Sequence, residues 1–251
     1  ALPEVMRVLT SPSNTGAVTL SVPQDVQTEA FDYPVELFEK RTWHIPRPPA
    51  DRSAIKRAAE WIRSASRPLI VAGGGVIYSE AEAALVDFIG HTGIPVMETF
   101  AGKGSLPYDH ALNLGAGGAT GTEGANYYSE RADLVIGIGT RYSDFTTASK
   151  TAFQNENVRF ININIAEFDA YKHAALALTG DARTILEEMS EMLNDYSTGE
   201  SYQQKATRFN RDWDNKVEAA YLPDTEGLPS QSEVVGALNE FSQSKDVLLC
   251  A

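Results

Sequence analysis

The sequence has almost no cysteine, and its single cysteine, Cys250, lies next to the last residue. One thiol cannot close an internal disulfide, so the composition excludes a disulfide-stapled secreted fold and fits a reducing cytoplasm. No apolar run reaches the ~20 residues that a membrane-spanning helix needs, and no basic-then-apolar leader opens the chain. We therefore expect a cytoplasmic protein without a membrane partner.

Basic residues are also scarce, since 21 Lys and Arg stand against 34 Asp and Glu and leave a formal net charge of −13. Such a surface repels phosphate backbones and anionic lipids, so nucleic acid is not an expected partner. The only four histidines are scattered without the spacing of metal ligands, and no metal site is predicted from them. These are His44, His91, His110 and His173.

The remaining composition is that of an ordinary globular protein. The chain has 251 residues, of which 43% are hydrophobic and 22% charged. That length and composition suit one large domain with substantial flanking pieces.

From residue 51 onward, apolar runs typical of buried strands alternate with amphipathic helical patterns. The expected strands are 68–72, 94–97, 133–139, 158–165 and 174–179. Asp51 or Ser53 is expected to cap a first helix, Ser79 and Glu82 to form a capping box for a second, and Asp181 to cap a third. The apolar stripes of the first two helices are Ile55, Ala58, Ala59 and Ile62, and Leu85, Phe88 and Ile89.

Continuously apolar strands alternating with helices indicate a parallel sheet that is covered on both faces. The predicted fold class is therefore α/β, with a Rossmann-like three-layer α/β/α central domain over residues 48–196. Truncated pieces of two further α/β domains are expected to flank it. Residues 1–35 would include a strand at 17–22 and a linker, 197–229 a helix and linker, and 230–251 a helix capped by Ser230 and Glu233 with a strand at 247–251.

Two glycine motifs follow predicted strands. Gly73, Gly74 and Gly75 could let the backbone approach a phosphate, but they lack the spaced dinucleotide fingerprint and better fit a tight strand–helix turn. The run 137–141 ends in Arg141, which could bind a phosphate or carboxylate, or pair with an acid at a domain interface.

Two further polar positions have simpler explanations. Lys103, between two glycines, could bind a phosphate but is better explained as a solvated loop lysine. The run Gly180-Asp181-Ala182 is superficially similar to a metal-diphosphate turn, but a helix N-cap accounts for Asp181.

An ordered series of short segments resembles the thiamine-diphosphate enzymes of the acetohydroxyacid synthase and pyruvate decarboxylase group. The segments are 16–26, 67–76, 93–96, 102–104, 115–121, 132–135 and 137–141. Each is weak singly, whereas their order along nearly the whole chain is specific. Segments 144–147, 161–164 and 168–173 are most similar to the branch that hydrolyses a cyclic 1,2-diketone in inositol catabolism.

The resemblance implies a central domain placed between a pyrimidine-binding and a diphosphate-binding domain. Thiamine diphosphate and Mg²⁺ would be held by elements outside this chain, so no catalytic residue is assigned here. Some relatives bind FAD or ADP in the central domain, and the positions for such contacts are Gly73, Gly74, Gly75, Thr140 and Arg141. The diketone-hydrolysing branch is not expected to need flavin.

The family also implies a homodimer or tetramer with active sites between subunits. Two alternatives stay open: another carboligase or decarboxylase of the same cofactor family, and a flavin- or nucleotide-binding module.

Overall fold

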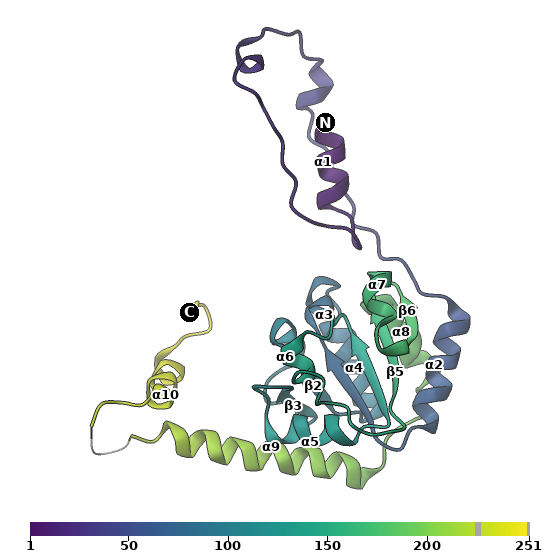
Figure 1. Ribbon diagram of the computed structural model, residues 1–251, viewed down its shortest axis with the longest axis vertical. Coiled ribbons are helices and arrows are strands. Elements are labelled where there is room, and N and C mark those ends of the chain that lie inside the picture. The colour runs from purple at the N-terminus through teal and green to yellow at the C-terminus, as the bar shows by residue number, and fades with distance from the viewer. Residues whose placement is uncertain (224–226, 250–251) are drawn as a thin grey trace.

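The computed structural model describes residues 1–223 and 227–249, and it centres on a six-stranded, all-parallel sheet (Figure 1). The strands are β1 Pro68–Ala72, β2 Val96–Glu98, β3 Asn113–Ala116, β4 Leu134–Ile138, β5 Arg159–Asn164 and β6 Leu176–Thr179. The predicted parallel sheet is confirmed.

The strand order is β3-β2-β1-β4-β5-β6, with β1 near the middle of the sheet. After β1 the chain builds β2 and β3 toward one edge, then returns to β4 on the other side of β1. Ile70 accordingly aligns with Val96 of β2 and with Ile136 of β4. The order therefore reverses between β1 and β4, and open parallel sheets bind ligands beyond the carboxyl ends of their strands at such a point.

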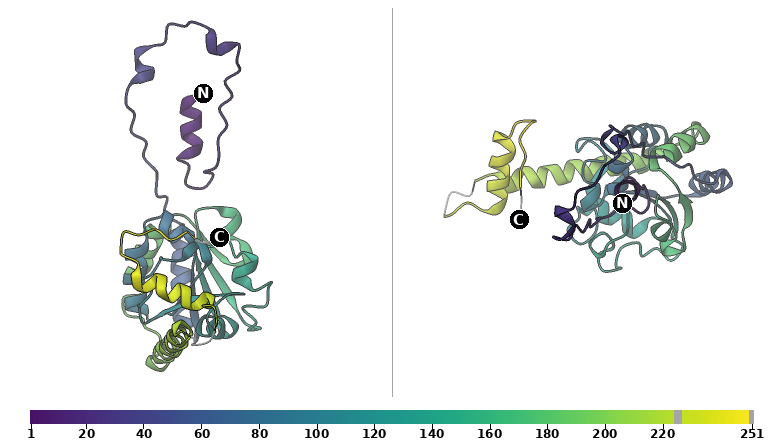
Figure 2. Two further views of the ribbon diagram at one scale, coloured as in Figure 1. Left: turned by 90° about the vertical axis from the view of Figure 1, so that its left-hand side faces the viewer. Right: turned by 90° about the horizontal axis from the view of Figure 1, so that it is seen from above.

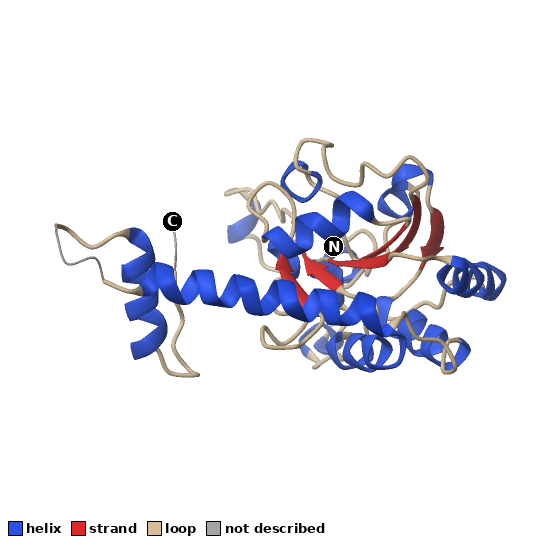
Figure 3. Ribbon diagram, turned by 90° about the horizontal axis from the view of Figure 1, so that it is seen from below, coloured by secondary structure: helices blue, strands red, loops and turns tan. Residues whose placement is uncertain are grey.

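Helices cover both faces of the sheet, which confirms the three-layer prediction (Figure 3). One core joins α2 Arg52–Ser64, α4 Glu82–Thr92 and α8 Ala182–Met192 to the sheet. The other core joins α5 Glu123–Arg131 and the first half of α9 Glu200–Tyr221 to the opposite face of the sheet. Within β1, Ile70 and Ala72 belong to the first core, and Leu69 and Val71 to the second, because side chains alternate along a strand.

Three predicted caps are confirmed. The Asp51 carboxylate accepts a hydrogen bond from the Ala54 amide at 2.9 Å. Asp181 accepts from the amides of Arg183 and Thr184 at 3.1 and 3.3 Å. Ser230 and Glu233 form the expected capping box of α10 Gln231–Phe241.

The capping box predicted for Ser79 and Glu82 is wrong. A short helix, α3 Gly74–Tyr78, precedes α4, and Ser79 is its C-terminal cap. Glu80 then takes a positive φ of 50°, and α4 begins after Ala81 without a side-chain cap. The turn that ends α3 therefore occupies the residue that the pattern assigned to the start of α4.

Two predicted flanking strands are also wrong. Residues 17–22 have no regular structure, and Leu20 and Val22 are exposed. Residues 247–249 form no strand, while Cys250 and Ala251 lie outside the described residues. An extended segment becomes a strand only when a neighbour accepts and donates its backbone hydrogen bonds, and the described sheet pairs with neither segment.

The glycine-rich stretch 102–124 contains one strand and the start of a helix that the sequence pattern did not predict. They are β3 and α5, the latter capped by the Thr122 side chain. Gly124 lies in the first turn of α5, where an added Cβ would come 2.9 Å from the Cβ of Phe209 in α9. Small residues here serve close helix packing, which weakens the apolar pattern.

The two flanks are less packed than the sheet domain. The N-terminal part contains α1 Leu2–Leu9 and two 3₁₀ turns, Val26–Thr28 and Val35–Phe38, and it stands away from the sheet domain before reaching α2 (Figure 2). At the other flank, α9 carries the chain out to α10 (Figure 1). Within the described residues, no helix is both long and apolar enough to cross a bilayer.

Candidate functional site

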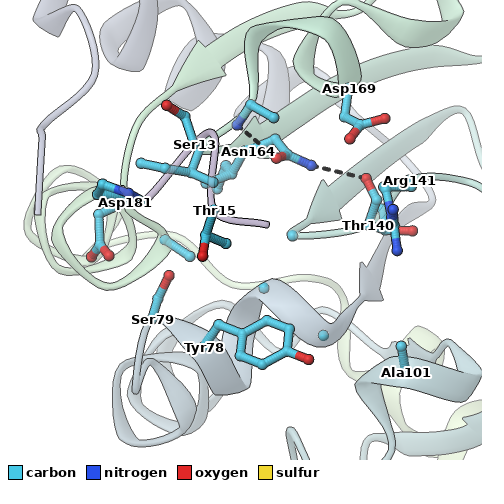
Figure 4. A pocket seen from close by; sticks show the side chains of 18 of the residues that line it. Ser13, Thr15, Tyr78, Ser79, Ala101, Thr140, Arg141, Asn164, Asp169 and Asp181 are labelled. Atoms are coloured by element: carbon cyan, nitrogen blue, oxygen red, sulfur yellow. Dashed lines mark hydrogen bonds between the residues drawn. The ribbon is translucent and has the colours of Figure 1, made fainter. Parts of the chain in front are cut away.

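A cavity of about 1240 Å³ lies at the carboxyl edge of the sheet, at the point where the strand order reverses. Its walls come from the segments that follow β1 to β5, from the turn before α8, and from residues 9–13, 15 and 43–47 of the N-terminal part. Figure 4 shows Tyr78, Ala101, Arg141, Asn164 and Asp181 around this space.

The floor of the cavity is a contact between two backbone turns. The Gly73 amide donates to the Ile138 carbonyl at 2.8 Å, and the Gly75 amide donates to the Gly139 carbonyl at 3.0 Å. A Cβ at Gly73 would lie 2.3 Å from the Gly139 oxygen, and one at Gly75 would lie 2.5 Å from the Gly139 Cα. These glycines are therefore required by the contact between turns, whatever ligand the cavity takes.

A third turn closes on the same point. It is the 3₁₀ turn η3 Phe100–Gly102, whose Gly102 amide donates to the Thr99 side chain at 3.1 Å. A Cβ at Gly102 would come 2.2 Å from the Ala72 carbonyl oxygen. The carboxyl ends of β1, β2 and β4 are thus held together by backbone contacts.

Asn164 fixes the rim beyond β4 and β5. Its side-chain amide donates to the Thr140 carbonyl at 3.0 Å, and its side-chain oxygen accepts from the Ala166 amide at 3.0 Å. The Thr140 hydroxyl accepts from the Tyr142 amide at 3.2 Å. The polar groups of Thr140 therefore already stabilise the turn itself.

The charges around the cavity are paired, with one exception. Asp169 pairs with Lys172 at 2.7 Å, and Asp181 pairs with Arg47 at 3.1 Å. Lys172 also donates to the Arg141 carbonyl at 2.8 Å. The Arg141 side chain has no hydrogen-bond or ion-pair partner in the part of the chain that the structure describes, so it offers a free guanidinium to the cavity.

Most of the predicted cofactor-binding residues come together at this cavity. Gly74, Gly75, Thr140 and Arg141 line it, and Gly73 lies behind them against the Gly139–Thr140 backbone. Lys103 is exposed and is not part of the lining. No group of three or more His, Cys, Asp and Glu side chains within residues 1–223 and 227–249 could hold a metal ion.

Sequence reasoning missed Arg47 and Asn164. Arg47 lies in a proline-rich segment without periodicity, so no pattern distinguishes it from its exposed neighbours. Asn164 ends a predicted strand, and a polar residue at the carboxyl end of a buried strand was the available signal.

An aromatic cluster supports the rim from behind. Tyr142 is buried, its hydroxyl donates to Asn162 at 2.8 Å, and burial raises the pKa of Tyr142. The His173 ring stacks on Phe160 with a centroid distance of 4.6 Å. Burial, and then the nearby Lys172 and Lys150, lower the pKa of His173.

The contact between turns predicts that Gly139→Ala is more damaging than Gly104→Ala. Both glycines have positive φ, 59° and 94°, but an added Cβ meets Gly75 at 2.4 Å in the first case and open space in the second. Gly104→Ala should cost about 1–2 kcal/mol from backbone strain, and Gly139→Ala about 1–3 kcal/mol more from crowding. Urea unfolding of both variants measures this difference. An equal decrease in the free energy of unfolding would show that the turns after β1 and β4 can move apart without cost.

Protonation of His173 should destabilise the fold. Its folded-state pKa lies below the ordinary value of 6.5, so the native state binds fewer protons than the unfolded state as pH falls through that value. Stability should therefore decrease from pH 7 toward pH 5. His173→Asn should flatten the decrease, since asparagine tolerates the φ of 59° at this position. An unchanged slope of unfolding free energy against pH in the variant would contradict this role.

Comparison with known proteins agrees with the geometry. Residues 55–189 match the sequence profile of the thiamine pyrophosphate enzyme central domain. The chain is 42% identical over 247 residues to the 3D-(3,5/4)-trihydroxycyclohexane-1,2-dione hydrolase of Clostridium perfringens, covering 94% of this chain and 39% of that protein. The protein of the same name from Geobacillus thermodenitrificans is 43% identical over 242 residues, covering 96% of this chain and 37% of that protein.

A solved structure shares the fold. It is that of a Mycobacterium smegmatis protein assigned to the thiamin diphosphate-dependent enzymes, with a TM-score of 0.53 and 22% identity over 62% of this chain and 30% of that one. The chain spans less than half the length of the curated relatives named above. From the profile match and these relatives, we conclude that the chain belongs to the thiamine pyrophosphate enzyme family and contains that family's central domain.

Proposed function

We propose that this sequence forms the middle of a thiamine-diphosphate-dependent hydrolase acting on 3D-(3,5/4)-trihydroxycyclohexane-1,2-dione. The reaction would break a carbon–carbon bond of the cyclic diketone and release a carboxylic acid during myo-inositol breakdown. One observation carries the proposal: relatives with that name are 42–43% identical over at least 94% of the chain.

The described residues do not fit the cofactor itself. When bound, thiamine diphosphate supplies an electron sink for cleavage of a bond beside a carbonyl. Its diphosphate needs a magnesium site of oxygen ligands, and the described side chains form no metal-ligand cluster. The cavity carboxylates Asp169 and Asp181 are engaged by Lys172 and Arg47. No catalytic residue is therefore assigned to this chain.

The chain instead contributes a structural framework for the cofactor-binding parts of the longer enzyme. The sheet and its helices form one packed body around two cores, and α9, a helix of 22 residues, leads from the second core toward α10. At a rise of 1.5 Å per residue, such a helix is roughly 33 Å long. We propose that this body sets the distance and orientation between the two cofactor-binding parts of the longer enzyme.

Finer properties follow from the same proposal. We propose that the enzyme uses Mg²⁺ with its cofactor, that it works in the cytoplasm, and that it assembles as a homodimer or tetramer. Another thiamine-diphosphate carboligase or decarboxylase is the nearest alternative, because the residues that select the substrate are not identified in this chain.

Turnover by a full-length protein that contains this sequence tests the proposal. With thiamine diphosphate and Mg²⁺, that protein should convert the trihydroxycyclohexanedione to an acid, which proton release and NMR of the product would detect. Residues 1–251 alone should show no tight thiamine diphosphate binding in calorimetry. Preferential turnover of pyruvate by the longer protein would favour the carboligase or decarboxylase alternative, and tight cofactor binding by residues 1–251 would contradict the spacer role.

A nucleotide site is a second candidate, and the free Arg141 guanidinium in the cavity favours it. FAD or ADP would contact Gly74, Gly75, Thr140 and Arg141, with Gly73 behind them. The glycine turn is a poor phosphate cradle, however. The amides of Gly73, Gly75 and Val76 already donate to backbone carbonyls at 2.8, 3.0 and 3.1 Å.

We therefore expect neither a flavin absorbance band in the purified protein nor tight ADP binding in calorimetry. A measured affinity that falls about 10–100-fold in Arg141→Met would instead establish the nucleotide site, because a charge-assisted bond to phosphate would be lost. Arg63→Met is the matched control, since Arg63 pairs with Asp195 and neither residue lines the cavity.

A further inference from the structure

Arg47 joins the N-terminal part of the chain to two turns of the sheet domain. Its guanidinium donates to the Ser79 carbonyl at the end of α3 and pairs with Glu80 at 2.9 Å. It also pairs at 3.1 Å with Asp181, whose carboxylate is buried at the start of α8. One side chain thus connects its own segment to residues 79–80 and to Asp181, which are distant from it and from each other in sequence.

The backbone beside Arg47 fits the same turn. The Asp181 amide donates to the Pro48 carbonyl at 2.8 Å. A Cβ at Gly180 would lie 2.8 Å from the Pro48 oxygen and 2.9 Å from the Ala50 nitrogen. The Gly180–Asp181 turn therefore accommodates the segment that enters α2, and the absence of a side chain at Gly180 makes the contact close.

The Arg47 contact lies at the point where an exposed segment of the chain reaches the cavity. Residues 16–46 are almost all exposed, and Ile45 is 65% exposed immediately before the contact. Residues 43–47 nevertheless line the cavity together with Ser79, Gly180 and Asp181. Arg47 is thus the point at which an exposed segment becomes a wall of the cavity.

We propose that Arg47 is a positioning residue that latches residues 43–50 onto the Gly180–Asp181 turn and so holds this segment against the cavity. The latch concerns contacts within the chain, and it stands whether or not the proposed enzymatic activity is correct. It also sets the direction in which the preceding part of the chain leaves the sheet domain.

The contacts that remain without Arg47 are sufficient to keep the turns of the sheet domain in place. Without Arg47, Asp181 still accepts from the amides of Arg183 and Thr184, so α8 keeps its cap. Glu80 still has Arg183 at 3.6 Å. Loss of Arg47 should therefore release residues 43–50 while leaving the sheet domain folded.

Trp43 is a built-in reporter, because it lines the cavity four residues before Arg47. Replacing Trp61 and Trp213 by phenylalanine leaves it as the only tryptophan of the chain. In this background, Arg47→Met should lower the residual anisotropy in time-resolved fluorescence, and Arg47→Lys should restore part of it. Hydrogen exchange at the Asp181 amide should also rise about tenfold in Arg47→Met, because the Pro48 acceptor is released.

Arg63→Met is the control, since Arg63 likewise bonds a carbonyl and a carboxylate, those of Met192 and Asp195, away from the cavity. It should leave both readouts unchanged. Gly180→Ala disrupts the same contact from the sheet domain, because the added Cβ would crowd Pro48 and Ala50. It should therefore lower the residual anisotropy of Trp43 as Arg47→Met does. Unchanged Trp43 anisotropy in Arg47→Met, or an equal change in Arg63→Met, would overturn the proposal.

Discussion

The close approach of the backbone after β1 to the backbone after β4 is the constraint on which the carboxyl edge of the sheet depends. Gly73 and Gly75 meet Gly139 at distances that exclude a Cβ on either side. This contact brings the carboxyl ends of β1 and β4 together at the point where the strand order reverses. It also engages the amides of Gly73 and Gly75, which a glycine-rich turn otherwise offers to phosphate, so the glycine run here indicates packing before it indicates a ligand.

Once those amides are engaged, the chemistry of the cavity depends on side-chain charge. Lys172 and Arg47 neutralise the two buried carboxylates, Asp169 and Asp181. Within residues 1–223 and 227–249, the Arg141 guanidinium is the formal charge of the lining that has no partner. On a chain with a formal net charge of −13, this guanidinium gives the cavity a local positive group for an anionic ligand.

The sequence was informative wherever burial determines the pattern. The central strands β1 and β4 are continuous apolar runs, and Asp51 and Asp181 cap helices because their carboxylates satisfy free amides. It was uninformative where contacts between distant segments decide the structure. β3 and α5 lie in a glycine-rich stretch whose small residues serve close packing, and Ser79 belongs to a turn that only the Arg47 contact and the positive φ of Glu80 explain. The grouping of the glycines with Arg141 was predictable from the strand ends, whereas their contact with Gly139 was not.

The long helix α9 has a mechanical consequence. Its first half is fixed by Ala206 in the second core and by the tight fit of Phe209 against Gly124, while its far end carries α10. The part of α9 beyond Phe209 is roughly 18 Å long, so a tilt of about 10° at Phe209 would move the far end by about 3 Å. The close fit of Phe209 against Gly124, together with the burial of Ala206, thus sets the direction in which α9 leaves the sheet domain toward α10.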